Sequence, residues 1–367
     1  MKAKVSPGKL ANALSAATAA AGSRLRLMDG VILRAEGEGL IVEATGDTGG
    51  AKFKIPAQVM EEGFIAVPLQ RTFRLLKNVD SEQIELSANE NGVRIEAGRV
   101  RVGLPAISGD CLPSFSALKG EAGERLSEAA VQAQPLRRTL RALSAIALDR
   151  HAWGWQGTVL LELREGRIRT VASDGKALLL QELPGKIQKP GGRIVIASFD
   201  ARNLAVFLGK TEGEVLLEDF ENCLFVSWSD TEYLIRKVDT SYPDFERVIR
   251  PQSLRGSFRA NADELASSLK RAQALDARVT ARLDSEEGVL RLSGESEEGS
   301  FTEILAVADA EGAGGVAISP EALLKLLRHF PAKEVVFRIQ EPGMPIILEG
   351  EEGSLGVVAT MAEEAEP

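Results

Sequence analysis

Three arginines, Arg137, Arg138 and Arg141, stand close together in the segment PLRRTLRALSAIAL (residues 135–148). The helical repeat of 3.6 residues places them opposite an apolar stripe. That stripe consists of Leu136, Leu140, Leu143 and Ala147. Because Arg137 and Arg141 are four residues apart, their like charges repel, and an anion outside the helix would offset that cost. For this helix taken alone an ordinary solvated face is the more common explanation, so both alternatives stay open.

A second segment repeats this arrangement and favours anion binding. Residues 68–78 place Arg71, Arg74 and Lys77 around the side opposite an apolar stripe. Six segments have the pattern of a helix: 6–20, 68–78, 134–147, 198–210, 261–275 and 319–331. They hold 13 Lys and Arg against four Asp and Glu, a net charge of +9, so the remainder must carry −18 to give the chain's total of −9. Positive charge sorted onto helices indicates a directed electrostatic field.

Little in the sequence supports catalysis. The chain has two histidines, His151 and His329, which is little material for a histidine-based metal site or a catalytic triad. Asp174 stands beside Gly175, but no base, nucleophile or phosphate-binding glycine loop accompanies it, so we expect it to hold a tight turn. We therefore predict a protein that is not an enzyme and uses no metal or cofactor.

Composition places the chain among globular proteins of two to three domains. It has 367 residues, of which 44% are hydrophobic and 26% are charged. No apolar run is long enough to span a membrane, and the N-terminal residues lack an apolar signal core, so we expect a cytoplasmic protein. Cys111 and Cys223 lack a paired spacing and are interpreted as reduced thiols. The acidic total argues against indiscriminate nucleic-acid binding, although a local basic surface remains compatible with it.

The sequence contains an internal repeat that occurs three times along the chain. A short β-type run, a turn and an amphipathic helix recur from Gly63, Gly192 and Gly314. A second helix repeats in phase with the first, at spacings of 126 and 129 residues. Each unit therefore reads as helix, strands, helix, strands over about 120 residues, and three units fill the chain.

Local signals mark where some of these elements begin and turn. Ser198 and Ser319 are expected to cap the N-termini of two helices, because a serine oxygen can accept a hydrogen bond from a free helical N–H. The Asn91-Gly92 pair predicts a β-hairpin.

Four segments resemble those of a known family. They are GRVRVGLPAISGDCLPSF (98–115), VASDGKALLL (171–180), SYPDFERVIRP (241–251) and VVATM (357–361). Each is similar to the corresponding segment of the bacterial sliding DNA clamp, the beta subunit of DNA polymerase III. Their order and spacing, together with the threefold repeat, extend the resemblance over the whole chain.

The resemblance implies an α+β fold of three similar domains of the DNA-clamp type, with boundaries at 1–124, 125–253 and 254–367. Two subunits would join head to tail as a homodimeric ring, with helices lining the inside and antiparallel sheets outside. Duplex DNA would thread the ring without being read by sequence, because basic helix faces would meet its phosphates. A processivity factor of this kind also implies protein partners: a replicative DNA polymerase, a clamp loader and repair proteins.

The cationic helix faces supply most of the predicted DNA contacts. They are Arg71, Arg74, Lys77, Arg137, Arg138, Arg141, Arg202, Lys210, Lys270, Arg271, Lys325 and Arg328. The resemblance adds Arg24 and the loop from Arg150 to Trp153. The alternative for any one of them is a solvated side chain or an ion pair with a neighbouring acid.

The resemblance also implies a pocket between the second and third domains, where partners dock a short extended peptide with apolar anchors. Its predicted lining is Trp155, Ser173, Gly175, Lys176, Leu178, Pro243, Arg247, Val248, Pro345, Val357, Val358 and Met361. Leu178, Val248 and Val357 could equally be ordinary core between domains. The chain departs from the family pattern here, because Ala177 stands where arginine is usual and Ala359-Thr360 replaces a Met-Pro pair.

Complementary charges mark the predicted joint between subunits. Its residues are Arg99, Arg101, Val102, Leu104, Leu275, Glu297, Glu298 and Glu303, with Glu295 and residues 301–305 on the acidic side. An unpaired edge strand invites pairing, and opposite charges would set the register. The alternative is two edges that are merely protected by charge.

Two other functions stay open on the sequence alone. One is a divergent clamp-fold adaptor that binds proteins without encircling DNA, and the other is a threefold-repeat hydrolase with an unrecognised site. Reversing the charge of the arginines in residues 135–148 would spare both of these functions and abolish the retention of a clamp on closed circular DNA.

Overall fold

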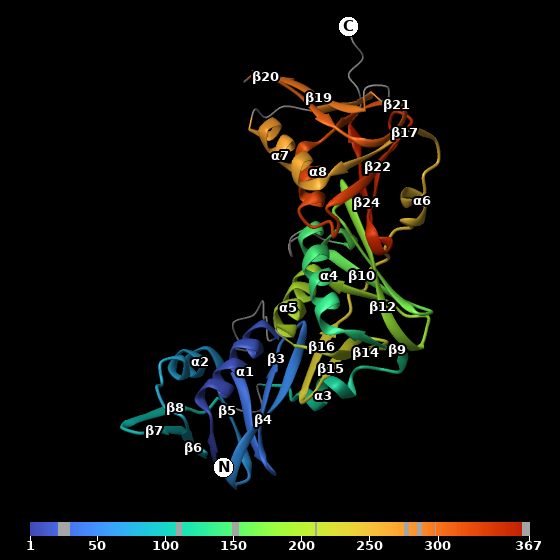
Figure 1. The fold of residues 1–367 in the computed structure, drawn as a ribbon. Helices are drawn as coiled ribbons and strands as arrows, with labels where there is room; N and C mark the ends of the chain where they lie inside the picture. Colours follow the sequence, from blue (N-terminus) through green and yellow to red (C-terminus); the bar gives the residue numbers. More distant parts are fainter. Residues whose placement is uncertain are drawn as a thin grey trace.

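The computed structural model describes residues 1–20, 30–107, 112–148, 154–209, 211–274, 279–284, 288–297 and 299–361. In this part of the chain the order strand, helix, four strands, helix, three strands occurs three times. We name the passages unit I (β1–β8), unit II (β9–β16) and unit III (β17–β25), the last ending in one additional short strand. The units follow one another along a crescent, from the N-terminus at one end to the C-terminus at the other (Figure 1).

The elements of each unit have the following bounds. Unit I contains β1 (Lys2–Val5), α1 (Pro7–Ala20), β2 (Gly30–Glu36), β3 (Gly39–Thr45), β4 (Gly49–Glu61), β5 (Gly63–Pro68), α2 (Leu69–Lys77), β6 (Ile84–Asn89), β7 (Gly92–Ala97) and β8 (Val100–Pro105). Unit II contains β9 (Arg125–Gln132), α4 (Ala133–Ile146), η3 (Trp155–Gly157), β10 (Thr158–Arg164), β11 (Arg167–Ser173), β12 (Ala177–Lys189), β13 (Arg193–Ala197), α5 (Ser198–Leu208), β14 (Glu214–Phe220), β15 (Cys223–Trp228) and β16 (Thr231–Arg236).

Unit III and the two connections complete the described elements. Unit III contains β17 (Leu254–Asn261), α7 (Ala262–Gln273), β18 (Val279–Asp284), β19 (Val289–Ser296), β20 (Gly299–Ala306), β21 (Ala308–Ile318), α8 (Pro320–Leu327), β22 (Glu334–Gln340), β23 (Ile346–Glu349), η4 (Glu351–Gly353), β24 (Leu355–Val358) and β25 (Thr360–Met361). The short helix α3 (Phe115–Gly120) lies between units I and II, and α6 (Glu246–Ile249) lies between units II and III.

All six helices predicted from periodicity are present, with ends that differ by a few residues. Ser319 caps α8 as predicted, because its side chain accepts a hydrogen bond from the N–H of Ala322. The prediction for Ser198 is wrong: this serine is the first residue of α5, and its hydroxyl donates to the carbonyl of Leu148. The hairpin predicted at Asn91-Gly92 joins β6 to β7.

The apolar stripe of α4 docks this helix on its sheet. Leu136, Leu140 and Leu143 are fully buried, whereas Arg138 and Arg141 are exposed on the other side. Burying a leucine side chain contributes about 2 kcal/mol, several times the cost of a repulsion between like charges four residues apart. Packing of the stripe therefore decides the orientation of α4, and the arginines are held outward.

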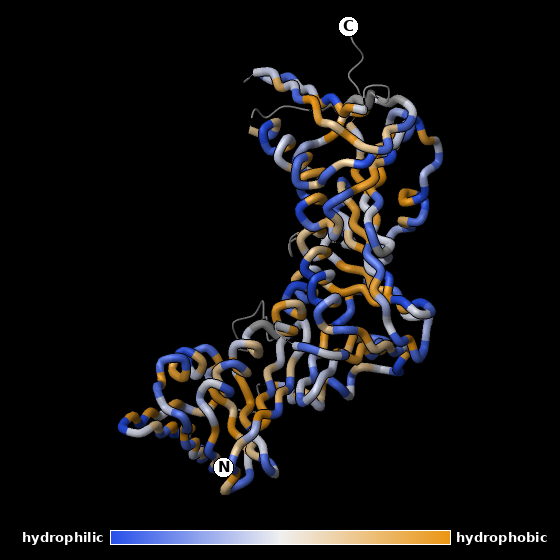
Figure 2. Tube along the Cα trace, viewed as in Figure 1, coloured by the Kyte–Doolittle hydropathy of each residue, from blue (hydrophilic) through white to orange (hydrophobic). Residues whose placement is uncertain are grey.

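Helices and sheets occupy opposite sides of the crescent. The helices pack in pairs, α1 with α2, α4 with α5 and α7 with α8, and they lie along the concave side (Figure 1). The antiparallel sheets form the convex side, and hydrophobic residues gather in the strands beneath the helices (Figure 2). One continuous cluster of buried apolar side chains runs through all three units.

Units I and II are joined by strand pairing. Residues Gly49–Phe53 of β4 pair with Thr231–Ile235 of β16 in antiparallel register. The approach is so close that a Cβ on Gly49 would lie 2.1 Å from the carbonyl oxygen of Leu234, so glycine is required there. The connecting helix α3 covers this pairing with a separate apolar cluster centred on Phe115.

Units II and III are joined in the same way. Ala177–Leu180 of β12 pair with Leu355–Val358 of β24, again antiparallel. Here the connection around α6 supplies the apolar cover, with Tyr242, Phe245 and Ile249 packed on the strands. The two junctions use equivalent strands. β12 follows the pair β10–β11 in unit II as β4 follows the pair β2–β3 in unit I, and β24 is the third strand after the second long helix of its unit, as β16 is.

Two sequence expectations concern thiols and membranes. Cys223 is a free, buried thiol, and burial raises its pKa to about 11, so it stays protonated at neutral pH. Cys111 lies outside the described residues. Among the helices of the described ranges, none has both the length and the apolar character needed to cross a membrane.

Candidate functional site

The concave face carries most of the predicted DNA-binding cations. Those exposed on its helices are Arg71, Arg74 and Lys77 of α2, Arg138 and Arg141 of α4, Arg202 of α5, Lys270 and Arg271 of α7, and Arg328 at the end of α8. Arg138 also faces a cavity of about 610 Å³ between α4 and the end of α8. A row of exposed cations on neighbouring helices concentrates positive charge on this face, although the chain's net charge is −9.

Arg137 points away from the row formed by its neighbours on α4. Its guanidinium is half-buried and donates a hydrogen bond to the backbone carbonyl of Gly209, at the C-terminal end of α5. This contact satisfies a carbonyl that the helix itself leaves unpaired. Arg137 therefore joins two helices, in contrast to the exposed Arg138 and Arg141.

Three other predicted DNA contacts are engaged inside the chain. Arg202 of α5 donates a hydrogen bond to the carbonyl of Ser144 of α4, at 3.3 Å. Lys325 of α8 donates to the carbonyl of Ile146, at 2.6 Å, and to Oδ2 of Asp174, at 2.7 Å. Arg271 of α7 forms an ion pair with Glu303 of β20, which was predicted to bind the other subunit. The hydrogen bond from Arg271 lowers the pKa of the Glu303 carboxyl against the opposing effect of burial.

Several predicted site residues lie outside the described residues. They are Arg24, Arg150, Trp153 and Lys210 of the DNA set, and Leu275 and Glu298 of the subunit joint.

A cavity of about 370 Å³ opens at the junction of units II and III. Nine of the twelve predicted pocket residues line it: Trp155, Ser173, Gly175, Lys176, Leu178, Pro243, Val248, Pro345 and Val357. Leu178 and Val357 sit opposite each other in the β12–β24 pairing and are buried, whereas Val248 of α6 is 41% exposed. An apolar floor with an open apolar wall and a polar rim can hold an apolar side chain of a bound segment.

Three of the predicted residues are absent from this lining. Val358 is fully buried because successive residues of β24 point to opposite faces of the sheet. Met361 lies in β25, which pairs with β21. Arg247 is an exposed residue of α6 and forms an ion pair with Asp244 at 3.4 Å.

Sequence reasoning missed several residues that complete the lining: Ala177, Tyr242, Asp244, Phe245, Gly343, Ala359 and Thr360. Tyr242 links an aromatic group, with its ring centroid 5.8 Å from that of Trp155 and 6.2 Å from that of Phe245. Burial raises the pKa of the Tyr242 hydroxyl above its ordinary value. Tyr242 and Phe245 lie in the segment 241–251 that carries the resemblance. Their apolar character was the sequence signal that could have assigned them to the pocket.

The turn between β11 and β12 forms one rim of the pocket. Asp174 lies in this turn, where the sequence predicted that it holds a tight turn. Oδ1 of Asp174 accepts hydrogen bonds from the N–H groups of Lys176, at 2.9 Å, and Ala177, at 2.8 Å. Gly175 has φ +93°, a conformation that favours glycine. Asp174 is thus a structural residue of the turn.

Two strands at opposite ends of the crescent keep one edge open. Among the described strands β8 pairs only with β7, and β20 pairs only with β19. Each edge exposes a large apolar residue, Val100 at 47% and Ile304 at 52%. The predicted joint residues Arg99, Arg101, Val102 and Leu104 lie on or just before β8. Figure 1 shows both edges at the tips of the crescent.

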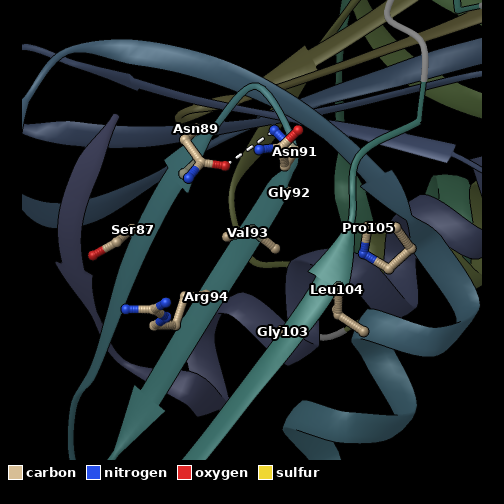
Figure 3. A pocket seen from close by; sticks show the side chains of 10 residues that line it. Ser87, Asn89, Asn91, Gly92, Val93, Arg94, Gly103, Leu104 and Pro105 are labelled. Carbon is tan, nitrogen blue, oxygen red and sulfur yellow. Dashed lines mark hydrogen bonds between the residues drawn. The ribbon is translucent and has the colours of Figure 1, made fainter.

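A hollow of about 460 Å³ lies over β6, β7 and β8 (Figure 3). Oδ1 of Asn89 accepts a hydrogen bond from the N–H of Asn91, at 3.0 Å, and this contact holds the hairpin turn. Arg94 of β7 lines the hollow together with Leu104 and Pro105 of the edge strand β8 (Figure 3). A strand that paired with β8 would therefore border this hollow.

The described residues contain no group of three or more His, Cys, Asp and Glu side chains that could hold a metal ion.

Comparison with known proteins confirms the resemblance to bacterial sliding clamps. No protein-family model matches the chain. The chain is 25% identical to the beta sliding clamp of Caulobacter vibrioides over 345 residues, 88% of each protein. It is 23% identical to that of Pseudomonas aeruginosa over 227 residues, which span 61% of this chain and 59% of the relative. The crystal structure of the Pseudomonas aeruginosa DNA polymerase sliding clamp superimposes with a TM-score of 0.89 over 99% of this chain and 100% of that one, at 20% identity. The α+β clamp fold predicted from the sequence is therefore confirmed.

The contacts of Arg137 predict a difference between it and its neighbour on the same helix. The Arg137→Ala variant should lose about 1 kcal/mol of unfolding free energy, because Gly209 loses a charged hydrogen-bond donor. The matched Arg141→Ala variant should stay within about 0.5 kcal/mol of the parent, because Arg141 is exposed. Urea unfolding followed by circular dichroism measures both. Equal losses would show that Arg137 does not join α4 to α5.

Proposed function

Since the chain has the fold of a DNA polymerase sliding clamp and resembles beta sliding clamps in sequence, we propose that it is a sliding clamp. Two copies join head to tail and encircle duplex DNA without reading its sequence. The ring is a non-catalytic processivity factor that tethers a replicative polymerase, a clamp loader and repair proteins through the pocket between units II and III. Its three domains span residues 1–124, 125–253 and 254–367.

The observation that carries this proposal is the repeated pairing between units. The strand that closes a unit pairs with the first long strand after the hairpin of the neighbouring unit: β16 with β4, and β24 with β12. The same rule leaves one closing strand, β8, and one receiving strand, β20, without a partner strand from a neighbouring unit among the described residues. Because both lie at the tips of one crescent, pairing β8 of one copy with β20 of another closes a ring of six units.

The repeat also predicts the register of that third pairing. Gly50 faces Leu234 at the first junction, and Leu178 faces Val357 at the second. The strands of the three units can be aligned by their residue pairings within each unit. In this alignment Ser300 occupies the position of Gly50 and Leu178, and Gly103 occupies the position of Leu234 and Val357.

Pairing Ser300 with Gly103 then places Arg101 opposite Thr302 and Val102 opposite Phe301. Val100, Val102 and Leu104 share one face of β8. In this register Val102 lies opposite Phe301, whereas Val100 lies opposite Glu303 and Leu104 opposite Gly299 of β20.

The cations of the concave face support the DNA part of the proposal. A closed ring would turn Arg71, Arg74, Lys77, Arg138, Arg141, Lys270 and Arg328 toward its hole. Duplex DNA carries one negative charge per about 1.7 Å, so it would meet these side chains along its whole length. Exposed, flexible side chains bind phosphate without fixing a register, which a sliding ring requires.

The pocket supports the tethering part of the proposal. Its floor of Leu178 and Val357 and its aromatic wall suit a short extended segment with apolar side chains. Ala177 and Thr360 line it in this chain, so the rim is small and carries few fixed charges.

Charge reversal tests the DNA-binding face. The double variant Arg138→Glu/Arg141→Glu should reduce retention on nicked circular DNA about tenfold, because each ring loses favourable contacts with phosphate and gains repulsion. Retention is measured by gel filtration after loading by the cell's own clamp loader. The parent should leave the DNA once the circle is cut.

A matched control keeps this test specific. The variant Lys186→Glu/Lys189→Glu reverses two exposed charges of β12, on the sheet side of the molecule, and should retain DNA as the parent does. Retention by the Arg138→Glu/Arg141→Glu protein equal to that of the parent would contradict the proposal and favour the adaptor that binds proteins without encircling DNA.

A disulfide tests the register of the subunit joint. The variant Arg101→Cys/Thr302→Cys should form covalent dimers under mild oxidation, because directly opposed residues bring their Cβ atoms within about 5 Å. The control Arg99→Cys/Thr302→Cys is shifted by two residues on the same strand face, where Cβ atoms are about 7 Å apart, and should crosslink poorly. Non-reducing electrophoresis measures the yield. Crosslinking of the control alone would overturn the register, and no crosslinking in either would count against the joint.

A further inference from the structure

Lys325 occupies an unusual place for a cation of the concave face. Its side chain is 29% exposed, and its ammonium group reaches from α8 of unit III into unit II. There it donates one hydrogen bond to the carbonyl of Ile146, at the C-terminal end of α4, and another to Oδ2 of Asp174. The end of a helix concentrates partial negative charge, so both acceptors favour a cation at this point.

Asp174 divides its two carboxylate oxygens between two tasks. Oδ1 accepts from the backbone of Lys176 and Ala177 and so shapes the rim of the pocket. Oδ2 is bound by Lys325. The carboxylate thus connects a side chain on a helix of the concave face to the three residues, Gly175 to Ala177, that line the pocket.

The environment of Asp174 shows that the pair is not a loose surface contact. The Asp174 side chain is only 11% exposed. Burial alone would raise the pKa of its carboxyl, but the hydrogen bonds from Lys325, Ala177 and Lys176 outweigh it, and the pKa lies below its ordinary value. A carboxylate that is charged and largely buried depends on its cationic partner, because an unpaired buried charge is costly.

The other contacts of this rim are weaker or belong to the backbone. Gln156 donates to the carbonyl of Asp174 at 3.4 Å, near the limit of a hydrogen bond. The N–H of Ala359 donates to the carbonyl of Lys176 at 2.8 Å. Among the described residues, Lys325 is therefore the charged side chain from unit III that fixes the rim to the adjoining unit.

We propose that Lys325 is a positioning residue of the partner pocket: it holds the Asp174 turn against α4 and α8 and so sets the shape of the rim that a bound segment contacts. The inference rests on the proposed role of this pocket in binding partners. It assigns Lys325 to the pocket, in place of the DNA contact predicted from the sequence, and it makes the packing of units II and III part of the binding site.

The first arm of the test measures the rim itself. Hydrogen–deuterium exchange of the segment from Ser173 to Leu178 reports how firmly the turn is held. In Lys325→Met, which keeps most of the unbranched side chain and removes the ammonium group, this exchange should be about tenfold faster than in the parent. Lys325→Arg should restore slow exchange, because it supplies a cation with similar reach.

The second arm measures binding. The probe is a short peptide with apolar side chains, acetyl-Leu-Ala-Leu-Phe-amide, because the floor of the pocket is apolar; it is titrated by calorimetry and by the fluorescence of Trp155. Lys325→Met should bind it about tenfold more weakly than the parent, the equivalent of one charge-assisted hydrogen bond. Asp174→Asn keeps the Oδ1 acceptor and removes the charge, so it should weaken peptide binding to the same extent as Lys325→Met. The double variant should bind the peptide no more weakly than either single variant.

Glu321→Gln is the matched control. Glu321 lies four residues before Lys325 on α8, is exposed, and has no ion pair with a described residue, so exchange and binding should equal those of the parent. Parental exchange and binding in Lys325→Met would overturn the inference, as would additive losses in the double variant. If the parent itself fails to bind the peptide, the proposed pocket fails, while the exchange arm still decides whether Lys325 holds the rim.

Discussion

Pairing of strands between units is the constraint on which the rest of this structure depends. At both junctions the contact is a short antiparallel ladder of main-chain hydrogen bonds, five residue pairs between β4 and β16 and four between β12 and β24. A backbone hydrogen bond contributes only about 1 kcal/mol, so each ladder needs an apolar cover. The clusters around Phe115 and around Tyr242 supply it.

The repeated pairing also sets the shape of the molecule. Because each unit attaches to the next through equivalent strands, every junction turns the chain in the same sense, and the helices stay on the concave side (Figure 1). The pairing proposed between β8 and β20 would be the one junction without a covalent connection or a covering linker. It would therefore be the weakest of the three kinds of junction.

The cations of the concave face divide into two groups by their partners. Arg138, Arg141 and Arg328 are exposed and offer their charge to solvent or to a ligand. Arg137 and Lys325 bind carbonyl groups at helix ends, and they hold neighbouring elements together. An exposed pair such as Arg271–Glu303 is worth at most about 1 kcal/mol, so a phosphate could compete for Arg271 far more easily than for the enclosed Lys325.

Periodicity along the chain was sufficient to predict the six main helices and the exposed sides of α2 and α4, because those features are local. The partners of Lys325 could not be predicted in this way, since Asp174 lies 151 residues away in the sequence. Gly209, the acceptor for Arg137, is a backbone group without any signature of its own. Both contacts arise from tertiary packing.

The pocket shows the same division. Leu178 and Val357, which were predicted from the segments that carry the resemblance, line the cavity. Val358 is absent from the lining, because the alternation of β24 places it on the opposite face from Val357. Tyr242 and Phe245 were missed although Pro243 and Val248 of the same segment were included, because their burial depends on α6 folding back onto β12 and β24.

The central claim is that the two open edges at the tips of the crescent pair with each other between copies. Sedimentation velocity of the purified chain at micromolar concentration tests it directly. The account predicts a predominant species of twice the chain mass of 39.4 kDa, with no growth into longer oligomers because the ring closes. A strict monomer, or an open series of larger assemblies, would contradict it.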